Sequence, residues 1–267
     1  MNLVTIEHLT KSYTERLLFD DTAFSINEGE KVGLIGINGT GKSTLLKIVA
    51  GLEEPDDGSV VRTRNLYIRY LPQIPEFTQG DTVLESIMRD NENETHYSSR
   101  EEMSATAKSM LNELGIRDHD ARVETLSGGQ RKRVALAGVL MSRAELLILD
   151  EPTNHLDMES IAWLETYLKS NAGSVIIVAH DRYFLDRVVT KIVELDNGIG
   201  TMFSGNYSAY SDKKAMLRDA KIRAYLNQQQ EIKHQEAVIE KLRSFNREKS
   251  IRRAESREKM LEKMDVI

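Results

Sequence analysis

Residues 36–43 read GINGTGKS and match the phosphate-binding pattern G-x-x-x-x-G-K-[ST]. The pattern follows an apolar run and precedes a helix-like segment. Backbone N–H groups of such a glycine-rich turn can surround phosphate oxygens, and the helix N-terminus adds its positive dipole end. Lys42 would reach the β- and γ-phosphates, and the Ser43 hydroxyl would ligate Mg²⁺. A glycine-rich turn without a ligand is the alternative, which the flanking strand and helix disfavour. The predicted phosphate-binding residues are Gly36, Asn38, Gly39, Thr40, Gly41, Lys42, Ser43 and Thr44.

Two acidic residues follow a second apolar run, Leu147–Leu149. In a chain with a phosphate loop, Asp150 at the end of a strand is suited to hold Mg²⁺ through water. Glu151 beside it could polarise an attacking water as a general base. Acids at a strand end can also be merely solvated, so the functional interpretation of this pair depends on the phosphate loop.

A third motif, LSGGQ, occupies residues 126–130 and would begin another helix. Ser127, Gly128, Gly129 and Gln130 would expose backbone N–H groups there, which makes a second anion-binding device. An ordinary helix start with Ser127 as its capping residue is the alternative. The motif alone does not distinguish the two.

Short apolar runs alternate with helix-like segments over the first two hundred residues. Several of the runs are apolar enough to be buried on both faces, and the alternation implies an α/β fold with a mainly parallel sheet. Two earlier segments, Leu3–His8 and Thr22–Ile26, look like an antiparallel piece, and residues 81–125 look like a small helical insertion. The predicted strands are Val32–Gly36, Leu66–Leu71, Leu146–Asp150, Ser174–Ala179 and Lys191–Leu195, and the predicted helices are Lys42–Ala50, Gln130–Leu140 and Ser160–Lys169.

In chain order, the phosphate loop, LSGGQ and the strand that ends in Asp150 and Glu151 resemble the motifs of the ATP-binding cassette (ABC) superfamily. The resemblance implies an ATPase that uses Mg²⁺ and an ABC-type P-loop domain: a RecA-like parallel sheet, an antiparallel β piece and a small helical subdomain. It places this domain at residues 1–206, with the helical subdomain at about 76–140. ABC ATPases hold two ATP molecules between two cassettes, so residues 127–130 would act on ATP bound to the other cassette.

The resemblance also assigns single residues. Gln73, in the string YLPQ, occupies the position of the glutamine that senses Mg²⁺ and water. His180 follows an apolar run and occupies the position of the histidine that contacts the γ-phosphate, and Tyr13 falls where an aromatic ring stacks on adenine. The implied catalytic set is Glu151, His180 and Gln73, and the implied Mg²⁺ set is Ser43, Gln73 and Asp150.

Two longer strings, EPTNHLD at 151–157 and HDRYFLD at 180–186, are similar to the ABC-F branch, which lacks membrane domains and acts on the ribosome. That branch joins two cassettes by a helical linker, whereas this chain carries one cassette. We therefore interpret the chain as a first cassette plus linker, and expect slow hydrolysis without a second cassette, either the missing half or a homodimer copy. An ABC transporter subunit is the alternative; a structural-maintenance or repair ATPase would need a longer gap before LSGGQ.

The net charge of −6 conceals a division, because residues 1–210 carry −11 and residues 211–267 carry +5. Beyond residue 207 the chain is rich in helix formers and lacks Gly and Pro, so we predict a charged helical hairpin over 207–267. Its first helix would cover 208–243, followed by a turn at 244–250. A solvated helical tail without a partner is the alternative.

A basic cluster surrounds the predicted turn of this hairpin. Such a cluster suits phosphate backbones, and the resemblance implies tRNA and rRNA near the ribosomal exit (E) site and the peptidyl-transferase centre. The sequence has no Cys and no apolar run long enough to span a membrane, so we expect a cytoplasmic location. The resemblance to the ABC-F branch implies that there is no membrane subunit. The predicted RNA-binding residues are Lys241, Arg243, Arg247, Lys249, Arg252, Arg253, Arg257 and Lys259.

Overall fold

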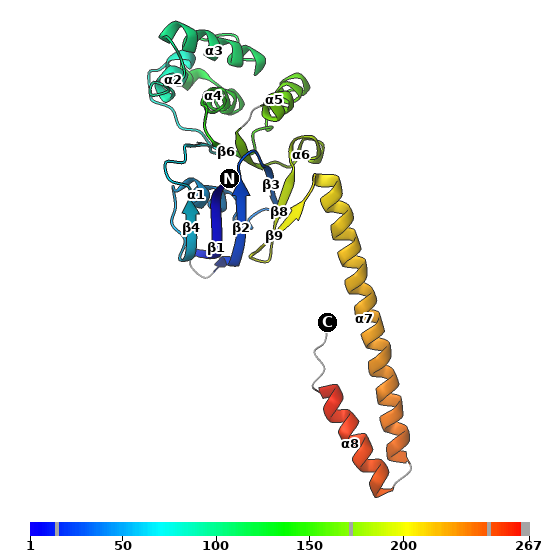
Figure 1. Cartoon of the computed structure of the whole chain (residues 1–267). Helices are drawn as coiled ribbons and strands as arrows, with labels where there is room; N and C mark the ends of the chain where they lie inside the picture. Colours follow the sequence, from blue (N-terminus) through cyan, green and yellow to red (C-terminus); the bar gives the residue numbers. More distant parts are fainter. Residues whose placement is uncertain (14–15, 171–172, 245–246, 263–267) are drawn as a thin grey trace. The chain divides into compact units, whose positions relative to one another are not determined.

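The computed structural model describes residues 1–13, 16–170, 173–244 and 247–262 (Figure 1). The chain divides into two compact units, Met1–Tyr210 and Ser211–Ile267. Residues 245–246 of the predicted turn, and 263–267 at the end of the predicted hairpin, lie outside the described residues.

The larger sheet of the first unit has the strand order β5-β6-β7-β3-β8-β9. Its first five strands are parallel, as predicted, whereas β9 pairs antiparallel with β8. All residues of β6 and β7 are buried, which explains their continuous apolar sequences. The bounds are β3 (Lys31–Gly36), β5 (Ile68–Leu71), β6 (Leu146–Asp150), β7 (Ser174–Val178), β8 (Lys191–Asp196) and β9 (Ile199–Ser204).

A smaller antiparallel sheet has the order β2-β1-β4. Its strands are β1 (Asn2–Tyr13), β2 (Arg16–Asn27) and β4 (Asp57–Arg62). The antiparallel pairing of β1 with β2 was predicted, although both strands are longer than the predicted segments. β4 was not predicted, because its sequence DGSVVR has only two apolar residues and is largely exposed.

Helix α1 (Lys42–Ala50) packs between the two sheets. The side chains of the larger sheet alternate between its faces, as the period of two requires. Leu146 and Ile148 of β6 share one buried cluster with α1 and the smaller sheet, whereas Leu147 and Leu149 share another with the other helices of the first unit. The phosphate loop between β3 and α1 is therefore held by both sheets.

The helices of the second cluster are α2 (Val83–Asp90), α3 (Arg100–Glu113), α4 (Gly128–Met141), α5 (Met158–Ser170) and α6 (Arg182–Val188). Helices α2, α3 and α4 contact one another and form a helical group at one end of the first unit (Figure 1). Ser127 caps α4: its hydroxyl accepts from the Gln130 N–H, and the Gln130 side chain accepts from the Ser127 N–H. The helix therefore begins two residues before the predicted start.

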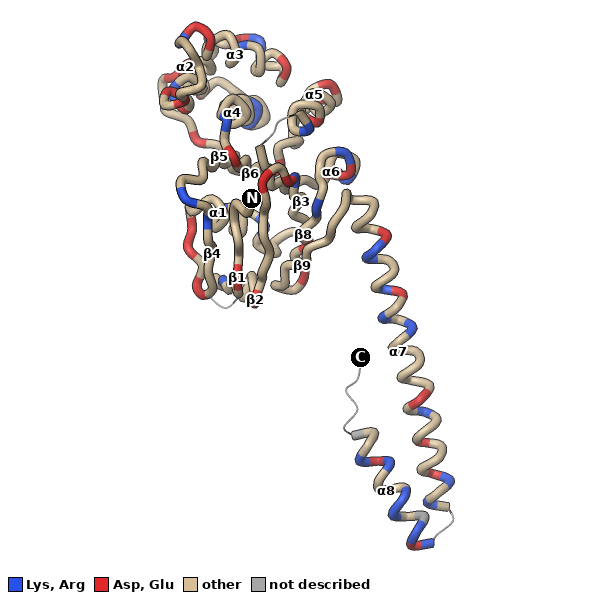
Figure 2. The backbone as a smooth tube through the Cα atoms, viewed as in Figure 1, with Lys and Arg blue, Asp and Glu red and all other residues tan. Residues whose placement is uncertain are grey.

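The second unit is a helical hairpin of α7 (Tyr207–Ser244), whose first turn belongs to the first unit, and α8 (Glu248–Glu262). Ile239 of α7 and Ala254 of α8 are both buried although most residues of the hairpin are exposed, so they mark the contact between the helices. An ion pair joins Arg243 and Glu258 at 2.9 Å. Figure 2 shows Lys and Arg concentrated along α8 and the end of α7.

Candidate nucleotide-binding site

The phosphate loop has a backbone that only glycine allows at one critical position. Gly41 has φ 91°, and a Cβ there would lie 2.8 Å from the Phe19 ring of the smaller sheet. Lys42 follows as the first residue of α1, and its ammonium donates to the carbonyls of Gly36 at 2.9 Å and Ile37 at 3.1 Å. Burial lowers the pKa of Lys42, and the nearby carboxylates of Glu151 and Asp150 oppose this shift.

A pocket of about 570 Å³ opens beside this loop, at the carboxyl ends of the parallel strands. Most residues predicted for the nucleotide site line it, although they come from separate parts of the chain. Gly36 and Thr40 belong to the loop without lining the pocket; the Thr40 hydroxyl donates to the Ile37 carbonyl at 3.0 Å. The lining residues are Tyr13, Leu18, Asn38, Gly39, Gly41, Lys42, Ser43, Thr44, Gln73, Asp150, Glu151, Val178 and His180.

Tyr13 ends β1 at the margin of this pocket, with 48% of its surface exposed. Its hydroxyl donates to the Glu53 carboxylate, and Lys11 Nζ lies 5.6 Å from its ring centroid. An exposed ring at this place leaves room for a planar base, and stacking on adenine stays a prediction.

The Glu151 carboxylate is surrounded by three side chains. Its Oε1 lies 3.1 Å from His180 Nε2, and its Oε2 accepts from Asn154 Nδ2 at 2.6 Å and from Gln73 Nε2 at 3.4 Å. Glu151 itself has φ 53°, a left-handed conformation that costs free energy in a residue with a side chain. Its N–H donates to the Val178 carbonyl at 2.8 Å. The neighbouring strand thus holds this turn, and the carboxylate points into the pocket in a fixed direction.

Asp150 ends β6 and is buried, with 1% of its surface exposed. Burial raises its pKa, while the Ser43 hydroxyl and the ammonium of Lys132 oppose this shift. Among the described residues, Oδ2 of Asp150 has no hydrogen-bond partner. A buried carboxylate oxygen without a partner, beside a hydroxyl, fits a site for Mg²⁺. Ser43, Gln73 and Asp150 would hold the ion, which would neutralise phosphate charge.

The LSGGQ motif lies outside this pocket. Ser127 and Gln130 form the cap of α4, while Gly128 has no atom within 4 Å of where its Cβ would lie. A Cβ at Gly129 would lie 2.9 Å from the Cβ of His155, so the motif packs against the turn that follows Glu151. The position is compatible with the predicted action on a nucleotide held by another cassette, which stays a prediction.

Two residues of this region were not singled out as functional by the sequence: Asn154, which contacts Glu151, and Lys132, a buried residue of α4. Asn154 was noted only as part of the string EPTNHLD. Asn154 lies in a turn in which its own N–H donates to the Glu151 carbonyl at 3.3 Å. Asn is common in turns, but no spacing in the sequence specifies the contact between the two side chains.

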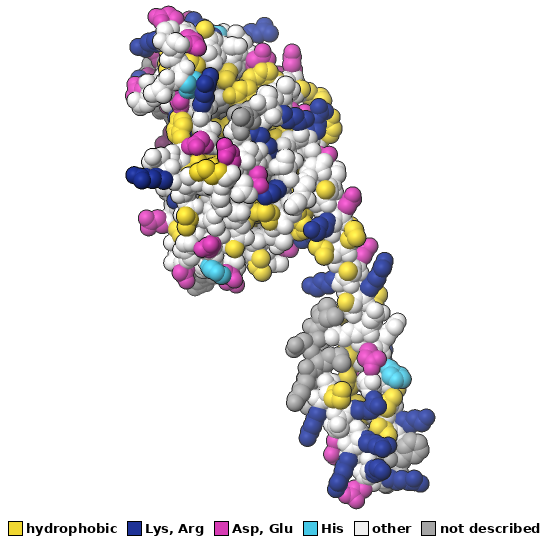
Figure 3. Space-filling view, in the orientation of Figure 1, with side chains coloured by type: hydrophobic (Ala, Val, Ile, Leu, Met, Phe, Trp, Pro, Cys, Tyr) yellow, Lys and Arg dark blue, Asp and Glu magenta, His cyan; other side chains and the backbone are white. Residues whose placement is uncertain are grey.

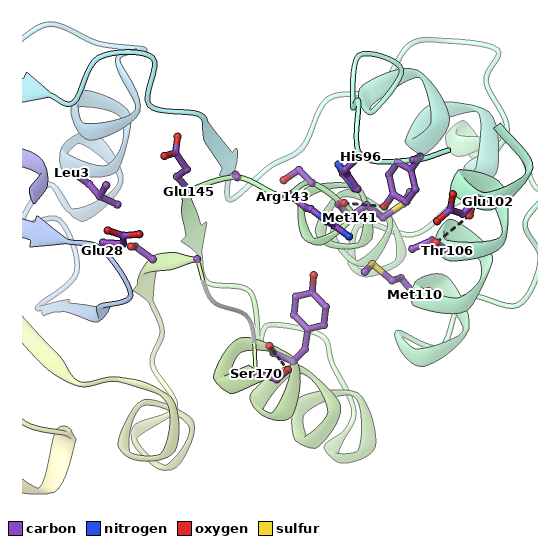
Figure 4. A pocket seen from close by; sticks show the side chains of 16 residues that line it. Leu3, Glu28, His96, Glu102, Thr106, Met110, Met141, Arg143, Glu145 and Ser170 are labelled. Carbon is purple, nitrogen blue, oxygen red and sulfur yellow. Dashed lines mark hydrogen bonds between the residues drawn. The ribbon is translucent and has the colours of Figure 1, made fainter. Parts of the chain in front are cut away.

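A larger cavity of about 700 Å³ lies at the opposite, amino end of the parallel strands (Figure 4). Two tyrosines on its wall donate to the last carbonyls of α4: Tyr97 to Met141 at 2.9 Å, and Tyr167 to Leu140 at 2.5 Å. Their hydroxyls therefore already satisfy a helix end. The cavity contains none of the predicted site residues, and its two tyrosines stabilise the end of α4.

The fold and the pocket together define a P-loop nucleotide-binding cassette. A family model described as "ABC transporter" matches residues 19–154, and a second one with the same description matches residues 193–267. The chain therefore belongs to the ABC transporter family, whose cassettes are ATPases. None of the helices that the structure describes is long and apolar enough to cross a membrane.

Curated relatives include the "Uncharacterized ABC transporter ATP-binding protein YfmR" of Bacillus subtilis, 42% identical over 80% of this chain. "ABC transporter F family member 2" of Arabidopsis thaliana is 36% identical over 98% of the chain. "Energy-dependent translational throttle protein EttA" of Mycobacterium tuberculosis is 36% identical over 85%. The matches cover 39%, 44% and 48% of these relatives, so the chain spans less than half of their length.

Solved structures show the same fold. A structure titled "Dimeric structure of a post-hydrolysis state of the ATP-binding cassette MJ0796 bound to ADP and Pi" is 25% identical, with a TM-score of 0.65 over 76% of this chain and 98% of that one. The similarity confirms the predicted ABC-type fold and the class of enzyme.

Proposed function

We propose that this chain is an ATP-driven cassette that acts on the ribosome in the cytoplasm, with the end of its hairpin contacting tRNA or rRNA near the E site and the peptidyl-transferase centre. The names of two relatives, an F family member and a translational throttle protein, support this proposal. A second cassette would complete each ATP site, and MgATP would be the ligand of the pocket.

The charge at the end of the hairpin is the observation that carries the proposal. We call residues 241–259 the basic tip; they contain eight Lys or Arg against three Glu, and all eight basic residues are exposed. Only two of the eight form ion pairs among the described residues, Arg243 with Glu258 and Arg252 with Glu248. Figure 3 shows dark blue side chains gathered at this end of the hairpin.

The arrangement of the two helices leaves this charge free to meet a polyanion. Ala254, Glu258 and Leu261 are the less exposed positions of α8 and recur at helical spacing, so they face α7. Lys249, Arg252 and Arg253 fall on other sides of the helix. Exposed cations of one sign release counterions from a phosphate backbone when they bind it, which gives affinity without sequence readout.

Hydrolysis would use the groups around Glu151. This carboxylate would accept a proton from the attacking water, and Asn154 and His180 would fix its direction. Lys42 and the backbone N–H groups of the phosphate loop would bind the phosphates. Mg²⁺, when bound, would offset the charge of the β- and γ-phosphates.

Co-sedimentation with ribosomes tests the proposal. The Glu151→Gln variant should bind ATP without turning it over, and it should pellet with ribosomes in ATP but not in ADP. A matched variant that also replaces Lys249, Arg252 and Arg253 by Gln should no longer pellet with ribosomes but should still bind ATP. Equal pelleting in both nucleotides, or in neither, would contradict the proposal.

The ATP-binding subunit of an ABC transporter is the second candidate. The description of both family models and a solved structure titled "Structure of ATP binding subunit of ABC transporter", with a TM-score of 0.67, favour it. Purification of the Glu151→Gln protein from membranes together with an integral membrane protein, and from no ribosomal fraction, would support this candidate.

A further inference from the structure

Lys132 is a buried lysine that contacts the nucleotide site from the helical side. It lies in the first half of α4, two residues after the LSGGQ motif, and only 4% of its surface is exposed. Its ammonium donates to three backbone carbonyls: that of Pro72 at 2.8 Å, that of Gln73 at 3.1 Å and that of Asp150 at 2.6 Å. All three protons of the ammonium are therefore used.

The three carbonyls lie where the pairing of β5 and β6 ends. Leu71 and Leu149 form the last pair of this parallel ladder. Pro72 has no N–H, so the next rung cannot form and the carbonyls beyond it need another donor. The Lys132 ammonium bridges the two strand ends at this point, and it sets the distance between the segment with Gln73 and the residue that ends β6.

This arrangement involves a buried charge without a directly paired carboxylate among the described residues. Burial lowers the pKa of Lys132, while the nearby carboxylates of Asp150 and Glu151 oppose the shift. Burying a cation costs free energy unless hydrogen bonds compensate it. An apolar side chain would fill the same space but would leave three carbonyls without a donor.

We infer that Lys132 is a positioning residue for the ATPase reaction: it ties the helix that carries LSGGQ to the backbone of Gln73 and Asp150. A displacement of α4 then moves the two segments that present Gln73 and Asp150 to the pocket. The inference depends on the proposed ATPase site but not on the proposed ribosome contact.

The position of Lys132 predicts which kinetic constant it controls. Phosphate binding depends on the loop between β3 and α1, which Lys132 does not touch. Gln73 reaches the Glu151 carboxylate only at 3.4 Å, so a small shift of its backbone would remove this contact. Loss of Lys132 should therefore lower kcat and leave the affinity for ATP nearly unchanged.

The test compares Lys132→Gln with Arg133→Gln. Arg133 is the matched control, because it is the next residue of α4 and also donates from a partly buried position to a carbonyl, that of Leu114 at 3.0 Å. We expect Lys132→Gln to lower kcat at least about tenfold while the Kd for ATP stays within about threefold, and Arg133→Gln to keep kcat within about twofold. A parallel fall of both variants that tracks their Tm values would overturn the inference.

A double-mutant cycle with Gln73→Ala separates positioning from a general loss of stability. If Lys132 acts through Gln73, Lys132→Gln should lower kcat much less in the Gln73→Ala background than in the parent. Lys132→Arg keeps the charge but spreads its donors in a plane, so this variant should fold. It should lower kcat less than Lys132→Gln does, and its effect should again be non-additive with that of Gln73→Ala. Additive effects of Lys132→Arg and Gln73→Ala would overturn the inference even where Lys132→Gln fails to fold.

Discussion

The side-chain amide of Asn154 donates a hydrogen bond to the Glu151 carboxylate, with 2.6 Å between Nδ2 and Oε2. Glu151 has a left-handed backbone, and the amide fixes the direction of its side chain from three residues further along the same turn. A hydrogen bond to a carboxylate is stronger than one between neutral groups. The general base proposed here is thus oriented by its own loop before any nucleotide binds.

Replacing Asn154 by Ser should lower the rate of ATP hydrolysis. The shorter side chain cannot reach Oε2, so the carboxylate would sample other directions, and we expect kcat to fall about tenfold with KM for ATP within about twofold. Steady-state hydrolysis measured over a range of ATP concentrations checks this. Asn93→Ser, an exposed amide in a turn, is the control. A change in KM with kcat intact would contradict the expectation.

Two inactive variants should restore activity when they are mixed, if each ATP site needs two cassettes. Gly128→Asp adds a negative charge to the LSGGQ motif, and its side chain meets open space, so α4 should stay folded. The Gly128→Asp variant repels phosphates at its LSGGQ motif but still has Glu151. The Glu151→Gln variant lacks the general base but still has an intact LSGGQ motif. One complete site forms in each mixed dimer. ATP hydrolysis by the mixture above the sum of the separate variants checks this, with Gly128→Ala as the control.

Replacing Asp150 by Asn should abolish hydrolysis and raise the stability of the fold. Because burial raises the pKa of Asp150, the folded chain holds this proton more tightly than the unfolded chain, and ionisation costs stability above the ordinary pKa of about 3.9. The amide removes this cost. We expect a Tm increase of about 2–4 °C at pH 7 without Mg²⁺ or nucleotide. The gain should shrink as the pH falls toward 4; a constant gain would contradict the electrostatic origin.

The basic tip should bind RNA with a strong dependence on salt. If about four phosphates are neutralised, the logarithm of affinity should fall with the logarithm of salt concentration with a slope of roughly −3. Replacing Lys249, Arg252 and Arg253 by Gln should reduce this slope by about 2. Replacing Lys221, Arg223 and Lys233 on the middle of α7 removes the same charge and should leave the slope nearly unchanged.

Much of the cassette could be predicted because its signals are local. Helix α1 has the predicted bounds, since Gly41 and Gly51 flank it in left-handed conformations that end the regular structure. Strand β6 was likewise placed correctly by its run of buried apolar residues. In both cases the sequence of the element itself contains the information.

Strand β9 was missed although a signal for it exists. Asn197 and Gly198 both have positive φ values, 49° and 82°, and connect β8 to β9 by a tight hairpin turn. The Asn-Gly pair is the sequence typical of such a turn. Gly200 and Thr201 separate the apolar residues of β9, which lies at the edge of the sheet, so its sequence contains no continuous apolar run.

The contacts of Lys132 could not be predicted in the same way. They depend on how α4 lies over the ends of β5 and β6, and no spacing within LSGGQRKR predicts that position. The same holds for the packing of Gly129 against His155. Contacts between distant parts of a chain follow from its tertiary fold, not from a motif.

The contact between Phe19 and Gly41 has a consequence for the order in which the protein folds. β1 and β2 adjoin in sequence, so the hairpin that carries Phe19 can form early, whereas β3, which leads into the phosphate loop, pairs with β7 and β8 from the second half of the cassette. The acids and His180 come from the second half of the cassette and join through non-local pairing, which is slow. A chain emerging during synthesis would therefore form the β1–β2 hairpin first, and its phosphate loop would be completed only together with the part of the site that contains Glu151 and His180. ATP, which needs both halves, should slow unfolding more than it speeds folding.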